Sequence, residues 1–186
     1  MAQIKNLKTP LTNEDLKNLR VGDKVSLTGP VYSARDAAHK RLVELVEKNE
    51  KLPFDLKGSA IYYVGPAPAK PGHAIGSAGP TTSGRMDAYT PLLISKGMKA
   101  MIGKGPRSEK VKQAMKEHGA VYLAAVGGAG ALISKSITKS DVVAYPELGA
   151  EAIRLMEVKD LPLIVAIDMF GNDLYQTGKE AYRKSA

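Results

Sequence analysis

The 186-residue chain contains no cysteine. This absence excludes a disulfide framework, a thiol nucleophile and a cysteine-ligated metal cluster built by this chain alone. The three histidines, His39, His73 and His118, are the remaining neutral nitrogen ligands, and no two of them have the spacing of a zinc site. We therefore expect this chain to hold no metal of its own.

Aromatic side chains are scarce, with two phenylalanines and no tryptophan. A surface that stacks nucleic-acid bases needs such rings, and the basic residues here are dispersed along the chain instead of gathered in a block. The net charge of +8 therefore favours a small anionic ligand or an anionic partner, and we expect no nucleic-acid partner. The alternative, a nucleic-acid binder, predicts an affinity for DNA or RNA that falls steeply with salt.

Long hydrophobic runs are also missing. The longest, VYLAAV at residues 121–126 and LPLIV at residues 161–165, are too short to cross a bilayer. The first ten residues have no apolar segment of the kind found in secretory signals. We expect no membrane partner and a cytoplasmic location, or an organelle matrix if a transit peptide was removed.

The composition that is present is ordinary for a globular protein, with 44% hydrophobic and 25% charged residues. Predicted strands alternate with predicted helices, which is typical of an α/β domain with a mixed sheet. We expect one domain over residues 1–186, with residues 1–20 as an N-terminal extension, and no internal repeat is visible.

Local patterns predict the individual elements. A short helix should begin after Thr12, a longer one should span residues 34–50 with Ser33 as its N-cap, and another should end at Gly119. Thr90 and Pro91 fit the N-cap and first position of a further helical piece. Strands are predicted at residues 59–65, 99–105, 120–126, 152–158 and 161–167, and as two short strands on either side of Gly29–Pro30.

Residues 65–84 form an unusual segment, because they hold five glycines and four prolines in twenty positions. A loop of this length inside a compact domain usually binds a ligand or links two domains. A linker would leave the first part of the chain with too little apolar periodicity for its own core. We therefore predict a binding loop that crosses the surface of one domain.

The end of this loop, Gly79 to Arg85, has the composition of an anion site. Glycines allow close approach of backbone N–H groups, Thr81, Thr82 and Ser83 add hydroxyl groups, and Arg85 adds a planar donor fork that matches a carboxylate or phosphate. The alternative is a helix cap followed by a solvated arginine. The segment is not a Walker A loop, since no Gly-Lys-Ser/Thr follows the glycines.

Two further cations fit a site at the carboxyl edge of a sheet. Lys104 lies between two glycines at a predicted strand end. The alternative is a lysine in an ordinary loop. Arg35 lies in the first helical turn, where the helix dipole disfavours a cation. An anion that bridges Arg35 and the free N–H groups would explain this placement, and a surface pair with Asp36 is the alternative.

The other titratable residues give weaker indications. Asp87 and His73 are possible acid or base groups, but neither has a partner at an informative spacing. Tyr62, Tyr63 and Tyr89 are expected to be packing residues with a polar tip. His39 alone is expected to be structural or on the surface.

Three stretches then point to a family. ARDAAH at residues 34–39, the block at residues 62–91 and MIGKG at residues 101–105 resemble the β region of the iron–sulfur hydro-lyases, which comprise class I fumarases and L-tartrate dehydratases. The resemblance extends from about residue 20 to VAIDMFGNDLY at residues 165–175. It implies a swivelling β/β/α domain.

The resemblance also implies a division of labour. In this family an α region carries three cysteines that hold a 4Fe-4S cluster with one open iron, which acts as a Lewis acid on the substrate. A chain without cysteine would then be a β subunit, inactive without its cluster-bearing α subunit, in an α2β2 heterotetramer. The resemblance assigns substrate carboxylate binding to Arg35, Arg85 and Lys104, a lining role to Thr82 and the catalytic base to Thr81, with Asp87 expected to orient Arg85.

The substrate stays open at this level between fumarate and malate on one side and L-tartrate on the other. Nothing in the sequence assigns the residue that would read the additional hydroxyl group of tartrate. A non-catalytic module that binds anions and keeps the same fold is a third hypothesis. It predicts that the isolated chain binds phosphate or a dicarboxylate tightly.

Overall fold

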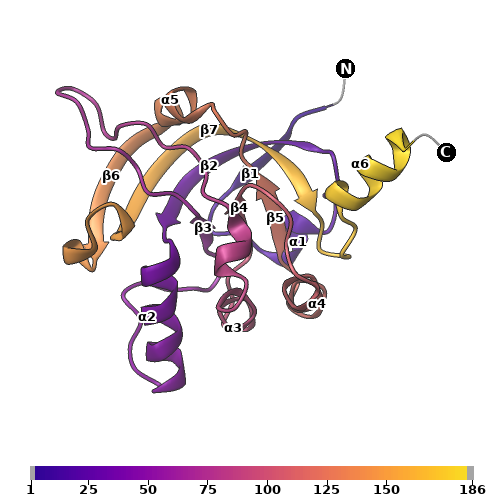
Figure 1. The fold of residues 1–186 in the computed structure, drawn as a ribbon, viewed down its shortest axis with the longest axis horizontal. Coiled ribbons are helices and arrows are strands. Elements are labelled where there is room, and N and C mark those ends of the chain that lie inside the picture. Colours follow the sequence, from indigo (N-terminus) through magenta and orange to yellow (C-terminus); the bar gives the residue numbers. More distant parts are fainter. Residues whose placement is uncertain (1–2, 184–186) are drawn as a thin grey trace.

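The computed structural model describes residues 3–183. The strands form a closed arrangement at the centre of the fold (Figure 1). The strands are β1 (Lys5–Lys8), β2 (Lys24–Ser33), β3 (Ala60–Tyr62), β4 (Ala100–Gly103), β5 (Val121–Ala124), β6 (Ile137–Ala144) and β7 (Ile153–Ile167). The helices are α1 (Asn13–Leu16), α2 (Asp36–Glu47), α3 (Thr90–Ser95), α4 (Glu109–His118), α5 (Gly130–Ile133) and α6 (Leu174–Tyr182), and the short 3₁₀ helices are η1 (Ser83–Met86), η2 (Ser134–Ser136) and η3 (Pro146–Glu151).

The sheet is mixed and closes on itself. The order is β1-β2-β3-β4-β5-β7-β6, and β7 also pairs with β2, so that β2, β3, β4, β5 and β7 form a barrel-like ring. Neighbours from β1 to β5 are parallel, whereas β7 runs antiparallel to β2, β5 and β6. The predicted α/β class with a mixed sheet is confirmed, and the swivelling type of domain stays a prediction.

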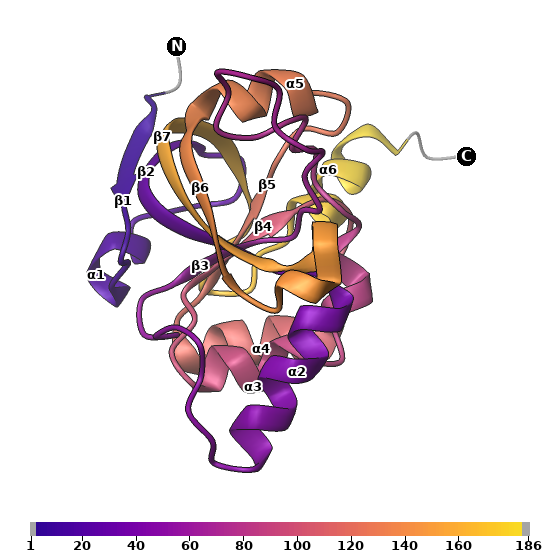
Figure 2. The same cartoon turned by 90° about the vertical axis from the view of Figure 1, so that its left-hand side faces the viewer.

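Alternation along the strands divides the interior into two cores. Tyr62 and Ile102 point into the barrel, whereas Tyr63 and Met101, one position away, pack against the helices. Helices α2, α3 and α4 lie together below the barrel, and α5 lies at the opposite end (Figure 2). Because both faces of the central strands are covered, these strands read as continuous apolar runs in the sequence.

Several predicted helix ends are confirmed, and others move by one or two residues. Thr12 caps α1 and forms a capping box with Asp15, and Gly119 ends α4 in the left-handed conformation. The predicted helix at residues 34–50 is α2, but its N-cap is Arg35 and not Ser33. Ser33 is instead the last residue of β2, where its hydroxyl accepts the Arg154 N–H at 3.1 Å.

Helix α3 begins one residue earlier than predicted, because Tyr89 holds the N-cap position and Thr90 is the first helical residue. The Thr90 hydroxyl donates to the Met86 carbonyl at 2.8 Å, so this side chain is buried within the turn before the helix.

The two short strands predicted around Gly29–Pro30 are wrong, because β2 is continuous through both residues. Gly29 has φ 113° at a shift in the register between β2 and β7, and a Cβ there would lie 2.5 Å from Thr9 Oγ1. A bulge at glycine therefore lets the strand continue past a proline that has no N–H to donate.

The end of the chain differs from the prediction in two ways. The strands predicted at residues 152–158 and 161–167 are one strand, β7, which passes through Asp160 at φ 51°. Strand β6 was not predicted, since half of its residues are polar and most are exposed at the edge of the sheet. In the described part of the chain, none of the helices combines the length and the hydrophobicity that a bilayer crossing requires.

Candidate functional site

The candidate site forms where β3 and β4 end. Tyr63 directly follows β3, and its carbonyl accepts the Thr81 N–H at 2.7 Å. Thr82 forms a parallel bridge with Lys104, whose carbonyl accepts the Ser83 N–H at 2.9 Å. The end of the long loop therefore lies between two strand ends, and Thr81, Thr82 and Lys104 meet at one edge of the sheet.

The loop of residues 65–79 leaves this edge and returns to it. Val64 and Pro80 form an antiparallel bridge at its base, and the Tyr62 hydroxyl donates to the Ala78 carbonyl at 2.6 Å. Ala78 also donates its N–H to the Gly130 carbonyl at 3.1 Å, which ties the loop to α5. The two ends of the loop are thus fixed, as a binding segment at a rigid sheet edge requires.

Glycine at position 103 is needed for this arrangement. A Cβ there would lie 2.0 Å from Ser83 Oγ and 3.2 Å from the Tyr63 ring. Ser83 is fully buried, and its Oγ is 2.8 Å from the Tyr122 hydroxyl, which donates to the Gly105 carbonyl at 2.9 Å. The glycines around Lys104 therefore let the loop approach the strand closely.

Arg85 and Arg35 come together through one carboxylate. Arg85 Nε donates to Asp36 Oδ1 at 2.8 Å, and Arg35 Nη2 lies 3.8 Å from Asp36 Oδ2. The Arg85 side chain is 53% exposed, so its two terminal nitrogens are available to a ligand, whereas the Arg35 side chain is 21% exposed. The Arg35 guanidinium lies against Gly65 at the base of the loop, where a Cβ would be 2.7 Å from Nη1.

The sequence predicts an anion that bridges Arg35 and the N-terminus of α2. In the structure a side chain of the protein, Glu151, takes this position. Glu151 Oε2 accepts the Ala37 N–H at 3.2 Å, and Glu151 Oε1 lies 3.4 Å from Arg35 Nη2. Glu151 therefore supplies a negative charge to the free end of the helix. Arg35 Nε is buried and has no hydrogen-bond partner within the described residues.

Asp87 does not orient Arg85, contrary to the expectation. Its carboxylate accepts from Arg107 Nε at 2.7 Å and from the Ser108 N–H at 2.6 Å, and Asp36 binds Arg85 instead. Sequence spacing suggested Asp87 because it lies two residues from Arg85. The 3₁₀ turn of η1 directs the two side chains to different partners.

Arg107 is a residue that the sequence did not single out. Its side chain is completely buried, its guanidinium lies 5.3 Å from the centre of the Tyr63 ring, and its Nη2 donates to the Thr90 hydroxyl at 2.9 Å. A buried arginine needs such partners to offset its lost hydration. Through Asp87 and Tyr63 it supports both ends of the Thr81–Arg85 segment.

His39 is structural, as one of the two readings of the sequence predicted. It is fully buried in α2, its Nδ1–H donates to the Arg35 carbonyl at 2.9 Å, and its ring meets the Tyr63 ring edge-on at 5.1 Å. Burial, and to a smaller extent the positive charge of Arg107, lowers the pKa of His39 to about 4, although the bond to Arg35 and the charge of Asp36 oppose this. The imidazole is therefore neutral at pH 7.

His73 is not part of the site. It lies in the exposed part of the loop, where its N–H donates to the Lys70 carbonyl at 3.0 Å. Tyr62 and Tyr63 are buried packing residues with bonded hydroxyl groups, as predicted, and Tyr89 is half-buried.

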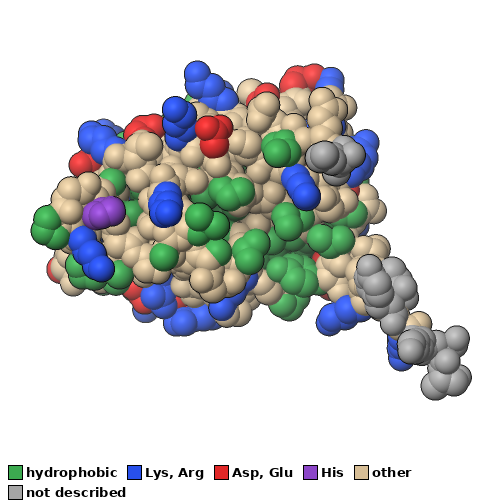
Figure 3. Space-filling model, turned by 90° about the horizontal axis from the view of Figure 1, so that it is seen from above, with side chains coloured by type: hydrophobic (Ala, Val, Ile, Leu, Met, Phe, Trp, Pro, Cys, Tyr) green, Lys and Arg blue, Asp and Glu red, His purple; other side chains and the backbone are tan. Residues whose placement is uncertain are grey.

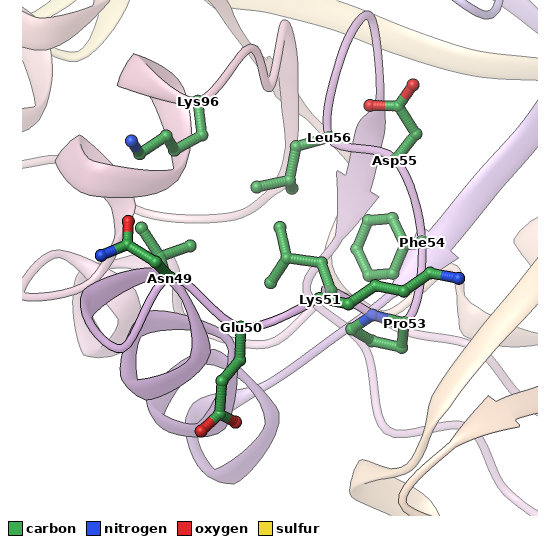
Figure 4. Close-up of a pocket in the computed structure, with 10 residues that line it drawn as sticks. Asn49, Glu50, Lys51, Pro53, Phe54, Asp55, Leu56 and Lys96 are labelled. Carbon is green, nitrogen blue, oxygen red and sulfur yellow. The ribbon is translucent and has the colours of Figure 1, made fainter.

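A hollow of about 570 Å³ lies elsewhere, between the end of α2 and the loop that precedes β3 (Figure 4). It is open, and Lys51, Lys96, Glu50 and Asp55 contribute charges of both signs to its wall. None of the predicted site residues lines it, so we place the candidate site at the sheet edge and not in this hollow.

The chain offers no site for a metal or an iron–sulfur cluster within the residues that the structure describes. It has no cysteine, and no group of three His, Asp or Glu side chains gathers closely enough to bind an ion there. The residues present do not fit a 4Fe-4S cluster, which the family resemblance assigns to the α region and not to this chain.

Comparisons with known proteins show the family of the chain. Residues 2–178 match the sequence profile of the fumarase C-terminus family. Fumarate hydratase 2 of Leishmania major is 43% identical over 174 residues, which are 91% of this chain and 31% of that protein, and the anaerobic class I fumarate hydratase of Escherichia coli K12 is 45% identical over 163 residues, which are 87% of this chain and 30% of that protein. This chain therefore spans under one third of each.

A third relative has a similar length. It is a Methanocaldococcus jannaschii protein provisionally named L(+)-tartrate dehydratase subunit beta, which is 42% identical over 181 residues, or 94% of this chain and 93% of that protein. The match of the family profile covers almost the whole chain. The chain belongs to the fumarase C-terminus family, whose relatives here are hydro-lyases.

Proposed function

We propose that this chain is the β subunit of a heteromeric hydro-lyase that hydrates fumarate to malate reversibly. The observation that carries the proposal is that cations lie beside Thr81 and Thr82 at one sheet edge, because Lys104 forms a bridge with Thr82 and Arg85 follows in η1. A dicarboxylate has two anionic ends and needs such separated cations to be held in one orientation. The fumarate hydratases that are 43% and 45% identical to the chain support this substrate class.

The cations divide into an exposed and a shielded set. Arg85 is fixed through Nε by Asp36, so its terminal nitrogens point their donor fork at one carboxylate of the substrate. Lys104 is exposed beside Thr82 and binds the other carboxylate as a point charge. Arg35 is held by Glu151 and Asp36, and we assign it to the same carboxylate as Arg85.

Thr81 is proposed as the base, and Thr82 lines the site. In the dehydration direction, the Thr81 oxygen takes the proton from the carbon next to a carboxylate, hydroxide leaves the neighbouring carbon, and the C=C bond forms between them. A hydroxyl group is a weak base, so this role requires cations that stabilise its deprotonated form. Thr81 is half-buried beside a cationic edge, which supports the assignment.

The chain is proposed to act only with an α subunit that carries the 4Fe-4S cluster, in an α2β2 heterotetramer in the cytoplasm. The absence of cysteine motivates this division, because the chain itself cannot ligate a cluster. Carboxylate binding and proton transfer are assigned to this chain, and assistance to the leaving hydroxide is assigned to the α subunit.

L-tartrate is the second candidate substrate. The relative named after a tartrate dehydratase β subunit is matched over 93% of its length, whereas the fumarate hydratases are matched over 30% and 31% of theirs. A separate chain of this length is thus found in a protein with that name. Malate and L-tartrate differ in one hydroxyl group, and the described residues of the site do not identify a side chain that would bind it.

The deciding experiment is to produce both chains together without oxygen and to assay fumarate, malate and L-tartrate. We expect the complex to interconvert fumarate and malate, or to dehydrate L-tartrate. Neither chain alone should have either activity. A cluster-loaded complex that is inactive on all three would overturn the proposal. Tight binding of phosphate or a dicarboxylate by the isolated chain in calorimetry would then support the non-catalytic anion-binding module.

A further inference from the structure

An apolar groove of about 520 Å³ lies at the end of the barrel that carries α5. It is formed by three segments that are far apart in the sequence, together with the middle of β7. Ile4, Val126 and Leu132 contribute large apolar side chains that are 56%, 60% and 62% exposed. The apolar groove is lined by Ile4, Val126, Ala129, Leu132, Pro162 and Ile164, among others.

Hydrophobic side chains gather on this face when the molecule is seen from above, with charged side chains around them (Figure 3). Lys24 and Asp160 stand at the rim of the apolar groove, and Asp160 Oδ1 accepts the Ser26 hydroxyl at 3.2 Å. An apolar centre with a polar rim is the usual anatomy of a protein interface. Single exposed apolar residues are common on monomers, but contiguous ones from separate segments mark an interaction site.

The apolar groove is continuous with the candidate site. Val126 in the groove is followed by Gly127, where a Cβ would lie 3.8 Å from Cδ of Lys104. The same loop leads into α5, and Gly130 of α5 accepts the N–H of Ala78 near the end of the binding loop. A protein that closes the site over Lys104 would therefore reach Val126 and Leu132 without a gap.

The first described residues of the chain also lie at the apolar groove. In the fumarate hydratases this region is the C-terminal part and covers only 31% and 30% of the protein, so most of their polypeptide precedes it. That preceding part joins at the end of the region where Ile4 lies in this chain, and Ile4 lines the apolar groove. A covalent link at this point keeps the preceding part beside the groove at high effective concentration.

We infer that the apolar groove is the docking surface for the chain that corresponds to the preceding part of the fumarate hydratases. The identity of that partner rests on the proposed function, in which it is the α subunit with the cluster. The partner places an apolar segment against Leu132, Val126 and Ile4 and continues over the loop at Gly127 to cover Lys104. Docking and completion of the site are thereby one event.

The test measures affinity and not activity. Leu132→Glu and Ile4→Glu each place a charge in the apolar groove, and both positions are more than half exposed, so the chain should fold as before. We expect the dissociation constant for the α subunit, measured by biolayer interferometry with or without its cluster, to rise at least about tenfold. Val142→Glu is the matched control, since Val142 is 42% exposed on β6 and does not line the groove.

The outcomes separate this inference from the proposed function. If the wild-type complex forms and Leu132→Glu weakens it, but the complex is inactive on fumarate, malate and L-tartrate, the docking surface stands and the proposed activity fails. If the complex is active and both groove variants bind as tightly as wild type, the docking surface is overturned. If the groove variants abolish self-association of the isolated chain but bind the α subunit as tightly as wild type, the docking surface is also overturned. The occupant of the groove would then be a second copy of this chain.

Discussion

Asp87 Oδ1 lies 2.7 Å from Nε of Arg107, whose side chain is completely excluded from solvent. The other oxygen of Asp87 accepts the Ser108 N–H at the start of α4. This pair therefore joins the end of η1 to α4 beneath the Thr81–Arg85 segment. A buried ion pair adds little net stability by itself, so we assign this pair to holding the loop in place.

Breaking this pair should be costly. Arg107→Met leaves Asp87 without its cation at a position that is 16% exposed, and we expect the free energy of unfolding to fall by about 3 kcal/mol. Urea denaturation followed by circular dichroism measures this change. The double variant Arg107→Met/Asp87→Asn removes the stranded charge and should recover part of the loss. A double variant whose loss equals the sum of the losses of Arg107→Met and Asp87→Asn would show that the two residues are not coupled.

Gly103→Ala should displace the Thr81–Arg85 segment. The added methyl group would lie 2.0 Å from Ser83 Oγ and 3.2 Å from the Tyr63 ring, so Ser83 must move from its contact with Lys104. We expect a loss of about 1–3 kcal/mol in the free energy of unfolding, the cost of overpacking a buried site.

Gly178→Ala in α6 provides the control for this substitution. Among the described residues, no atom outside the helix's own backbone and the two chain neighbours lies within 4 Å of a Cβ built there, and alanine favours a helix more than glycine does. This variant should be as stable as wild type or slightly more stable. Equal stability of Gly103→Ala and Gly178→Ala would mean that Ser83 can move without cost.

The protonation of His39 should give a pH dependence of stability. The pKa is about 4 in the folded protein and 6.5 in the unfolded chain, so the unfolded state binds more protons between these values. Stability from the neutral imidazole is thus full above pH 6.5 and is lost as the pH falls toward 4. Between pH 7 and pH 5 we expect it to decrease by about 2 kcal/mol.

His39→Asn isolates this contribution, because it keeps a donor for the Arg35 carbonyl and does not titrate. The difference in unfolding free energy between wild type and His39→Asn should shrink by that amount from pH 7 to pH 5. Parallel pH profiles for the two proteins would show that the pKa of His39 is not lowered by burial.

Thr81→Ala in the reconstituted complex should reduce kcat by about 100-fold or more, with a smaller change in KM, since a general base acts on the transition state. Thr81→Ser keeps the hydroxyl group and should retain most of the activity. A Thr81→Ala complex with the wild-type kcat would remove Thr81 from the role of base.

Asp36→Asn should act on substrate binding through Arg85. It removes the carboxylate that fixes Nε of Arg85 and lies 3.8 Å from Arg35, so the donor fork is no longer held in place. We expect KM to rise about tenfold with a smaller effect on kcat. Glu147→Gln, which removes the exposed partner of Arg41 elsewhere on α2, should leave KM unchanged. A similar change in both variants would point to a general charge effect.

Local signals in the sequence were sufficient for much of the fold and for the centre of the candidate site. Thr12 and Gly119 were recognised as helix ends because capping depends on neighbours within a few residues. The Thr81–Arg85 segment was recognised because its hydroxyl groups, glycine and arginine are adjacent in the sequence.

What could not be predicted depends on partners far along the chain. The N-terminus of α2 is neutralised by Glu151, which is 114 residues from Ala37, and no local pattern identifies it. The same holds for β7, where Ser26 binds the side chain of Asp160 and the strand continues through a position that looked like a break. Arg107 was not singled out, because nothing near it in the sequence indicates its burial.

The position of β7 has a consequence for synthesis of the chain. Strands β2 and β5 both need β7 as a neighbour, and β2 pairs with it over residues that are more than a hundred positions away, such as Ser33 with Arg154. While the ribosome makes residues 1–150, the ring therefore has two open edges of apolar strands, which are prone to pair with other chains. Closure must wait until residues 153–167 have emerged, so the edges of β2 and β5 stay open to pairing with other chains until β7 has been made.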